Sequence, residues 1–273
     1  MANAQLQVLE IDHINQLLPD TDQALEFYER VYGGKDFRTF RKVFGPYDNF
    51  VFKLGSMTME IFTPGDPEQS FGKQYSRYGA NWQAVLWRVP NLEECIETFR
   101  SKNIPLVDIE LDPDRRWAFT DPRATYFSIQ LEDRDEWDKT IDPAGIGAEK
   151  MVGYTAVVKD GEEAARFFTD LIDGADVVYQ EDRPKLNASA IGVKLGESGY
   201  TMELLSPTGD GVISAFIDKN KVRIRTATFK VDSLDALSTH FAEHGITLVE
   251  GDRADTLATK PEDNLGVMMQ FTE

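Results

Sequence analysis

The chain begins with apolar and polar residues in alternation and then changes to a helical period. VLEIDHINQLL, residues 8–18, alternates at every second position, which predicts a strand. DTDQALEFYERVYG follows with Asp20 or Thr21 as N-cap and an apolar helical face of Ala24, Leu25, Phe27, Tyr28 and Val31. Three strand-like runs come next: DFRTFRKV, NFVFKLG and MTMEIFTP. The predicted unit is a βαβββ module.

This order of elements recurs along the whole chain. A second module is predicted from WQAVLWRV, the helix NLEECIETFRSKN, and strands near PLVDIEL, RWAFTD and TYFSIQLE. Both modules then return in the second half. Phe27-Tyr28 matches Phe167-Phe168 at an offset of 140 residues, and Met59-Glu60-Ile61 matches Met202-Glu203-Leu204 at an offset of 143. The chain is therefore predicted to be an internal duplication of paired modules.

The repeat predicts an α+β fold. Two βαβββ modules side by side make a cupped eight-stranded sheet with its helices outside, so the duplication predicts two such sheets. We predict a first domain at residues 1–137, a linker at 138–149 and a second domain at 150–273, because the segment DRDEWDKTIDPAGIGAEK is polar and contains Pro and Gly.

Charge and composition exclude several classes of partner. The chain has 273 residues and a net charge of −18, which disfavours binding to nucleic acid or to an anionic membrane surface. It has neither a secretory signal nor an apolar run of transmembrane length, so we expect a cytoplasmic protein. Cys95 is the single cysteine, which rules out an intramolecular disulfide and predicts a small buried side chain on its helix.

Four βαβββ modules in tandem resemble the vicinal oxygen chelate superfamily, which includes glyoxalases, bleomycin-resistance proteins and extradiol dioxygenases. The resemblance covers essentially the whole chain and implies a divalent metal ion in the cupped sheet, held by residues of the first and last strands. His13 matches the first-strand ligand position, with Leu18 five residues on and Asp20 seven residues on. Glu60, between apolar residues in MEIF, matches the last-strand position. An imidazole and a carboxylate are suitable ligands for a first-row metal.

The second module departs from the family pattern. Ala84 stands at its first-strand ligand position, and the neighbouring Gln83 could substitute only through a one-residue slip of register. Gln130 stands where the family usually has Glu, and its amide oxygen could still bind a metal. The resemblance thus implies a first-domain site of His13, Glu60 and Gln130.

The second half has lost most of these ligands. Gly153 and Thr226 occupy the two His positions, while Glu203 and Gln270 stand at the last-strand positions. Arg225, beside Thr226, would repel a cation if it faced the cup. We therefore expect no metal in the second domain.

Other side chains are candidates for the substrate pocket or for structural roles. Residues on strands or loops that line such cups are Tyr47, Asn49, Gln83, Trp117 and Tyr126. Arg38 and Arg41 are three positions apart on one predicted strand, so at most one of them faces the cup. His240 and His244 have zinc-chelating helical spacing without a third ligand nearby, which favours a solvated helix face.

These residues predict an enzyme that acts on a small, oxygenated, partly apolar organic molecule in the first-domain cup. His13 and Glu60 are the catalytic candidates, since an imidazole is a suitable general base near neutral pH even without a metal. FTDPRATYFSIQL and KPEDNLGVMMQF resemble the methylmalonyl-CoA-epimerase-like branch, which favours proton transfer of the isomerase or lyase type. Extradiol-type dioxygenation is less favoured, because the resemblance implies that iron dioxygenases of this fold need two His and one Glu. The alternative is a metal-free protein that sequesters a small molecule, as bleomycin-resistance proteins do. Either a monomer or a homodimer is compatible with the tandem fusion.

Overall fold

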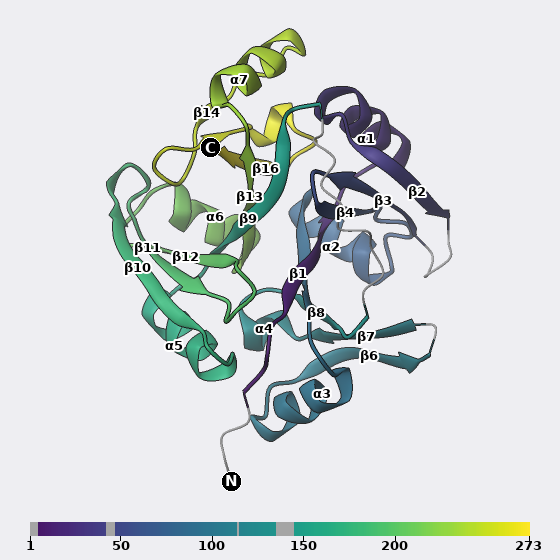
Figure 1. Ribbon diagram of the computed structural model, residues 1–273, viewed down its shortest axis with the longest axis vertical. Coiled ribbons are helices and arrows are strands. Elements are labelled where there is room, and N and C mark those ends of the chain that lie inside the picture. The colour runs from purple at the N-terminus through teal and green to yellow at the C-terminus, as the bar shows by residue number, and fades with distance from the viewer. Residues whose placement is uncertain (1–4, 42–46, 114, 135–144) are drawn as a thin grey trace. The chain divides into compact units, whose positions relative to one another are not determined.

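The strands form two mixed sheets of eight strands each, with helices outside them (Figure 1). The structure is a computed structural model that describes residues 5–41, 47–113, 115–134 and 145–273. The strand order is β2-β3-β4-β1-β5-β8-β7-β6 in the first sheet and β10-β11-β12-β9-β13-β16-β15-β14 in the second. The two orders are identical once eight is added to each label. This confirms the predicted α+β class and its tandem repeat of paired modules.

The first half contains two modules with the expected order of elements. The first module comprises β1 (Glu10–Leu17), α1 (Thr21–Phe27), the π-helical turn η1 (Tyr28–Tyr32), β2 (Lys35–Arg41), β3 (Asp48–Leu54), β4 (Met57–Phe62) and α2 (Ser70–Tyr78). The second comprises β5 (Asn81–Arg88), α3 (Leu92–Ser101), β6 (Leu106–Asp112), β7 (Arg115–Thr120), α4 (Pro122–Thr125) and β8 (Ile129–Glu132).

The second half repeats this order. Its first module comprises β9 (Ala148–Val157), α5 (Gly161–Leu171), β10 (Asp176–Arg183), the 3-10 turn η2 (Pro184–Leu186), β11 (Ala188–Lys194), β12 (Thr201–Pro207) and α6 (Val212–Asn220). Its second comprises β13 (Arg223–Val231), α7 (Leu234–Glu243), β14 (Val249–Glu250), β15 (Leu257–Ala258), the 3-10 turn η3 (Pro261–Asp263) and β16 (Met268–Thr272). Helices α2 and α6, which follow β4 and β12, were not predicted from the sequence.

The main helix of each module begins in the same way. The side chains that cap α1, α3, α5 and α7 each accept a hydrogen bond from the backbone N–H three residues later, and they are Asp20, Asn91, Asp160 and Ser233. Asp20, rather than Thr21, is therefore the N-cap of α1. The predicted first helix is shorter than expected as an α-helix, because it changes to π geometry at Tyr28 and ends at Gly33 in the left-handed conformation (φ 66°).

Backbone contacts divide the chain into two compact units, and each unit draws on both halves of the sequence. The first unit comprises Met1–Asp12, Ala84–Glu136 and Gly153–Ile224. Its core includes Phe168 of α5, whose ring centroid lies 6.1 Å from that of Trp87 and 5.6 Å from that of Phe127. The packing of α5 therefore joins a segment of the first half to one of the second.

The second unit comprises His13–Gln83, Trp137–Val152 and Arg225–Glu273. Tyr32 is fully buried there, with its ring 5.3 Å from that of Phe241 on α7. Its hydroxyl donates a hydrogen bond of 2.7 Å to Oδ1 of Asn264. Aromatic packing and one buried polar bond thus connect η1 with the last module.

The predicted linker, residues 138–149, lies outside the described residues as far as position 144, and Ala148 and Glu149 already belong to β9. The predicted domain limits of 1–137 and 150–273 stay a prediction. Within the described ranges, no helix is both long and apolar enough to cross a membrane. Cys95 is buried, as expected, and burial raises the pKa of its thiol.

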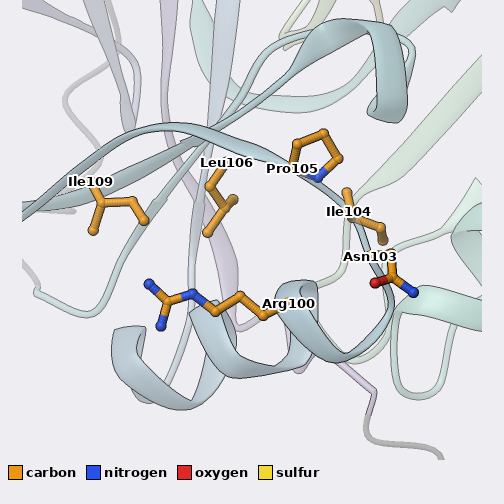
Figure 2. A pocket seen from close by; sticks show the side chains of 6 residues that line it. All are labelled: Arg100, Asn103, Ile104, Pro105, Leu106 and Ile109. Carbon is orange, nitrogen blue, oxygen red and sulfur yellow. The ribbon is translucent and has the colours of Figure 1, made fainter.

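Figure 2 shows a pocket in the first unit, between α3 and β6. The lining residues are Arg100, Asn103, Ile104, Pro105, Leu106 and Ile109. None of them was a candidate site residue.

Replacing Tyr32 by Phe should lower the free energy of unfolding by about 1–3 kcal/mol, because the buried Oδ1 of Asn264 loses its hydrogen-bond donor while the ring packing stays. Urea unfolding followed by circular dichroism measures the change. A loss below about 0.3 kcal/mol would show that this bond does not stabilise the unit.

Candidate functional site

The first module presents one sheet face on which residues of β2, β3, β4 and β1 lie in three rows across the strands. The rows are Lys35–Lys53–Thr58–His13, Arg38–Val51–Glu60–Asn15 and Phe40–Asn49–Phe62–Leu17. Directly opposed residues in neighbouring strands point to the same side of a sheet, so these twelve residues share one face, here called the His13 face. The even-numbered residues of β1 point the other way, and there Gln16 accepts a hydrogen bond from Tyr28, which follows α1.

His13 and Glu60, the two catalytic candidates, meet on this face. Nε2 of His13 lies 3.3 Å from Oε2 of Glu60. The His13 side chain is 5% exposed and that of Glu60 is 14% exposed, so the pair is shielded while the carboxylate keeps some access to solvent. A charge-assisted N–H···O bond is shorter, about 2.7–2.9 Å, so Nε2 is not held in a tight bond by this carboxylate.

Asn49 fixes the other oxygen of Glu60. Its Nδ2 donates a hydrogen bond of 2.8 Å to Oε1 of Glu60 across β3 and β4. Asn49 is 1% exposed, and its Oδ1 is buried without a hydrogen-bond partner among the described residues. Asn49, which was predicted to line the pocket, therefore orients the Glu60 carboxylate. Its own amide oxygen accepts no hydrogen bond from the described residues.

Aromatic rings lie at one end of the His13 face. Phe62 belongs to the third row, and its ring centroid lies 5.0 Å from that of Phe71 on α2. Tyr47 completes the group, with its ring 4.7 Å from Phe71 and 5.5 Å from Phe62. The predicted pocket residue Tyr47 thus lies beside the row that contains Asn49. The contribution of Phe71 was missed, because α2 was not predicted.

Gln130 lies in the first compact unit, whereas His13 and Glu60 lie in the second. It is 7% exposed, and its Nε2 donates a hydrogen bond of 2.7 Å to Oε1 of Glu132. In β5, the residue opposite Gln130 is Leu86. Gln83 is three residues before Leu86 in β5, and side chains alternate between the two faces of a strand. The register of β5 is regular from Val85 to Arg88, so Gln83 points to the face opposite that of Gln130. The role of Gln130 as a ligand stays a prediction.

Trp117 and Tyr126 have different surroundings in the same unit. Trp117 is two residues before Phe119, which pairs with Gln130, so it shares the face of Gln130; its Nε1 donates a hydrogen bond of 3.2 Å to Asp108. Tyr126 instead packs against α5, with its ring 5.6 Å from that of Phe167. Burial and the nearby carboxylates of α5 raise the pKa of Tyr126.

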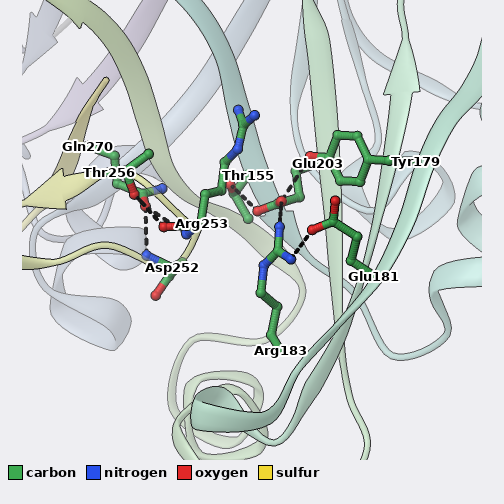
Figure 3. Close-up of polar contacts among 9 residues, drawn as sticks. All are labelled: Thr155, Tyr179, Glu181, Arg183, Glu203, Asp252, Arg253, Thr256 and Gln270. Carbon is green, nitrogen blue, oxygen red and sulfur yellow. Dashed lines mark hydrogen bonds and ion pairs between the residues drawn. The ribbon is translucent and has the colours of Figure 1, made fainter. Parts of the chain in front are cut away.

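In the second half, Glu203 occupies the position of Glu60 but has different neighbours (Figure 3). It is 2% exposed, and its Oε1 accepts a hydrogen bond of 3.0 Å from Thr155. Its Oε2 accepts one of 2.9 Å from Tyr179 and one of 3.3 Å from Arg183, which also pairs with Glu181. Burial opposes the charge of Arg183, but the two carboxylates outweigh it and raise its pKa.

Two glycines determine which side chains can lie next to Glu203. Gly153 stands where the first module has His13, and a Cβ there would lie 2.2 Å from the backbone oxygen of Thr201. A Cβ on Gly192 would meet the ring of Tyr179, also at 2.2 Å. Position 153 therefore has no room for an imidazole, and the missing side chain at 192 lets Tyr179 lie across the sheet to Glu203.

Gln270 also has a structural role, in the second unit (Figure 3). It is fully buried, and its Oε1 accepts hydrogen bonds from the backbone N–H of Asp252 (2.7 Å) and the hydroxyl of Thr256 (3.2 Å). Arg225 forms an ion pair with Asp252, with its Nε at 2.6 Å. Gln270 thus orders the segment between β14 and β15.

The donor chemistry of the His13 face fits a divalent ion. Two donors that share one tetrahedral ion, with bonds of about 2.0–2.2 Å, lie roughly 3.3 Å apart, which matches the separation of His13 Nε2 and Glu60 Oε2. The buried Oδ1 of Asn49 is a third oxygen on this face. The described residues contain no cluster of three or more His, Cys, Asp or Glu that could hold a metal. His240 is on α7, with its Nε2 2.7 Å from the carbonyl oxygen of Val31, and His244 is the C-cap of this helix.

Comparison with known proteins places this architecture among solved structures. No known family and no curated protein sequence matches the chain. A triple mutant of 4-hydroxymandelate synthase from Streptomyces coelicolor is similar with a TM-score of 0.77 and 14% identity, over 97% of this chain and 92% of that one. The 2,3-dioxygenase LapB from Pseudomonas sp. KL28 has a TM-score of 0.66 and 13% identity, over 98% of this chain and 93% of that one.

A fusion protein of a xylose isomerase-like TIM barrel with a 4-hydroxyphenylpyruvate dioxygenase has a TM-score of 0.69 and 10% identity, over 98% of this chain and 49% of that one. These similarities extend over nearly the whole chain and agree with its strand order. The chain therefore has the fold of the vicinal oxygen chelate superfamily, with four βαβββ modules in tandem.

Proposed function

We propose that this chain is an enzyme of the vicinal oxygen chelate type that transfers a proton on a small, oxygenated, partly apolar organic molecule. The observation that carries the proposal is the buried pair of His13 Nε2 and Glu60 Oε2, 3.3 Å apart on the His13 face. A shielded imidazole next to a carboxylate is suited to general acid–base chemistry. The full-length similarity to enzymes of this fold supports the same class.

Nε2 of His13 is the proton acceptor in this proposal. The 3.3 Å contact leaves Nε2 outside a tight hydrogen bond, and the imidazolium that forms when Nε2 takes a proton lies next to the Glu60 carboxylate. The opposite charge stabilises the protonated state, and burial strengthens that interaction relative to water. His13 returns the proton to a neighbouring atom of the substrate, which gives isomerase-type or lyase-type chemistry.

Asn49 positions Glu60 for this role. Its hydrogen bond to Oε1 leaves Oε2 directed at His13, so the carboxylate does not need to reorient when the imidazole becomes charged. The rings of Phe62 and Phe71 provide apolar surface beside the pair. The substrate is accordingly a molecule with an apolar part next to its reactive carbon.

His13 and Glu60 would hold a divalent ion, which would supply a Lewis acid beside a substrate oxygen. Metal binding at Nε2 would remove that atom as a base. Nε2 of His13 therefore acts either as a metal ligand or as a base, and metal analysis of the purified protein distinguishes these two states.

The second half does not contribute chemistry in this proposal. Glu203 is already neutralised by Arg183 and hydrogen-bonded by Tyr179 and Thr155, and Gly153 cannot be enlarged without moving the backbone of Thr201. Because Arg183 already balances the charge of this buried carboxylate, neither a metal ion nor a charged substrate is required to stabilise it. This module stabilises the fold.

His13→Gln should lower the rate of proton exchange by about 10²–10⁴-fold, since it removes the base from an otherwise unchanged strand. The measurement is hydrogen–deuterium exchange at the carbon next to the ketone, followed by proton NMR, with phenylpyruvate and its methyl ester as probes. His244→Gln, at the C-cap of α7, is the matched control and should exchange like the wild type.

Metal content of wild-type and His13→Gln protein, purified without chelator, completes this experiment. A near-stoichiometric divalent ion that is lost in His13→Gln assigns Nε2 to the metal. Equal exchange rates in the wild type, in His13→Gln and in buffer contradict proton transfer at this site. A wild-type protein that binds both probes without accelerating exchange indicates a sequestering protein instead.

Arg183→Met should lower the free energy of unfolding by about 3–5 kcal/mol, because it leaves the buried Glu203 carboxylate without its cation. Adding Glu203→Gln should recover most of this loss, while exchange at the His13 face stays at the wild-type rate. Arg166→Met, at an exposed position of α5, is the control and should change stability by less than about 0.5 kcal/mol. Urea unfolding measures the stabilities, and a double variant no more stable than Arg183→Met contradicts the charge argument.

A further inference from the structure

Two of the three histidines of the chain take no part in the proposed function. His240 lies in the last turn of α7, and His244 is the C-cap of that helix, four residues later. Side chains at this spacing lie next to each other on one face of a helix. Both histidines are half-buried, so a small ion in solution can reach their rings.

Each of these rings has one nitrogen next to a backbone carbonyl. Nε2 of His240 lies 2.7 Å from the oxygen of Val31, and Nδ1 of His244 lies 2.9 Å from the oxygen of His240. A carbonyl oxygen only accepts hydrogen bonds, so these two nitrogens carry the protons of the neutral rings. The lone pairs are therefore on Nδ1 of His240 and on Nε2 of His244. Histidines that bind metal ions are commonly oriented in this way, with the second nitrogen donating to a carbonyl or carboxylate.

The distance between the two rings suits a shared ion. Their centroids lie 4.6 Å apart, and the ring planes are inclined by 36°. An ion about 2.0–2.1 Å from a ring nitrogen lies roughly 3.2 Å from the centroid of that ring. Two rings on one ion then have centroids roughly 4.5 Å apart for an angle of about 90° at the ion, and roughly 5.2 Å apart for about 109°. The observed distance matches the right angle of octahedral or tetragonal coordination.

This geometry selects a class of ions. Imidazole nitrogen is a suitable donor for Ni²⁺, Cu²⁺ and Zn²⁺, and the right angle favours Ni²⁺ and Cu²⁺ over tetrahedral Zn²⁺. Mg²⁺ prefers oxygen ligands. In the part of the chain that the structure describes, no third His, Cys, Asp or Glu joins such a pair, so water completes the coordination.

We propose that His240 and His244 form a binding site for a transition-metal ion of the Ni²⁺ or Cu²⁺ type. The site goes beyond the proposed function, because neither residue lies on the His13 face. It also differs from the metal excluded for the second half, since that expectation concerned strand positions in the cup and this pair is on a helix. A cation at Nδ1 of His240 polarises the N–H group at Nε2 and strengthens its bond to Val31. The ion therefore stabilises the contact between α7 and η1.

Calorimetric titration of the His13→Gln protein with Ni²⁺ tests the proposal, because this variant lacks the imidazole of the other candidate metal site. We expect it to bind one Ni²⁺ ion. Adding either His240→Gln or His244→Gln should weaken binding about 100-fold, since a single imidazole cannot chelate the ion. Mg²⁺ is the second probe and should bind far more weakly than Ni²⁺. A net charge of −18 alone would attract both ions to a similar extent.

Glu243→Gln in the same His13→Gln background is the matched control, because it removes an exposed carboxylate of α7 and should keep the affinity for Ni²⁺. Ni²⁺ should also raise the midpoint of thermal unfolding of the His13→Gln protein, and this rise should disappear when His244→Gln is added. The same melting curves show that each variant is folded. Four results would each overturn the proposal: no Ni²⁺ binding to the His13→Gln protein, unchanged affinity without His240 or His244, an equal loss in Glu243→Gln, or Mg²⁺ binding as tight as that of Ni²⁺.

Discussion

The parallel pairing of β1 with β4 is the constraint on which the candidate site depends. It brings His13 within 3.3 Å of a glutamate that is 47 positions later in the sequence, and it continues through β3 and β2 as three aligned rows. A slip of one residue in this pairing would turn His13 to the helix-covered side, where Gln16 meets Tyr28. Because that side is filled by apolar residues such as Ile14, Met59 and Ile61, the core itself holds the register.

The same backbone position has different chemistry in the two halves. Glu60 and Glu203 both lie on the strand that pairs with the first strand of their half. Glu60 is next to a neutral or ionisable imidazole and an amide, whereas Glu203 is next to a permanent cation, a phenol and a threonine. The charge of Glu203 is balanced by the guanidinium of Arg183. Glu60 lies next to an imidazole, so a proton, a metal ion or a substrate can still interact with this pair. The duplication thus retains one fold twice while its halves differ in what they can do.

Helix packing links the halves in a way that the repeat alone does not suggest. Phe168 of α5 packs against Trp87 and Phe127, and Tyr32 packs against Phe241 on α7. These rings are buried, because each finds an apolar partner in another module. As a result, each compact unit contains segments of both halves.

The sequence by itself determined the local pattern: strand and helix periods, the repeat, the α+β class, and the positions of His13 and Glu60 within their strands. These follow from periodicity, which is a property of neighbouring residues. Tertiary structure decided which side chains meet, including Arg38 rather than Arg41 on the His13 face, Arg183 beside Glu203, and Tyr126 against α5 rather than at a cup. The bulge in β2 between Lys35 and Arg38 shows why, since one extra residue changes which side chains share a face and only the pairing with β3 reveals it. Contacts between distant strands depend on register, and register is set by the packing of the whole sheet.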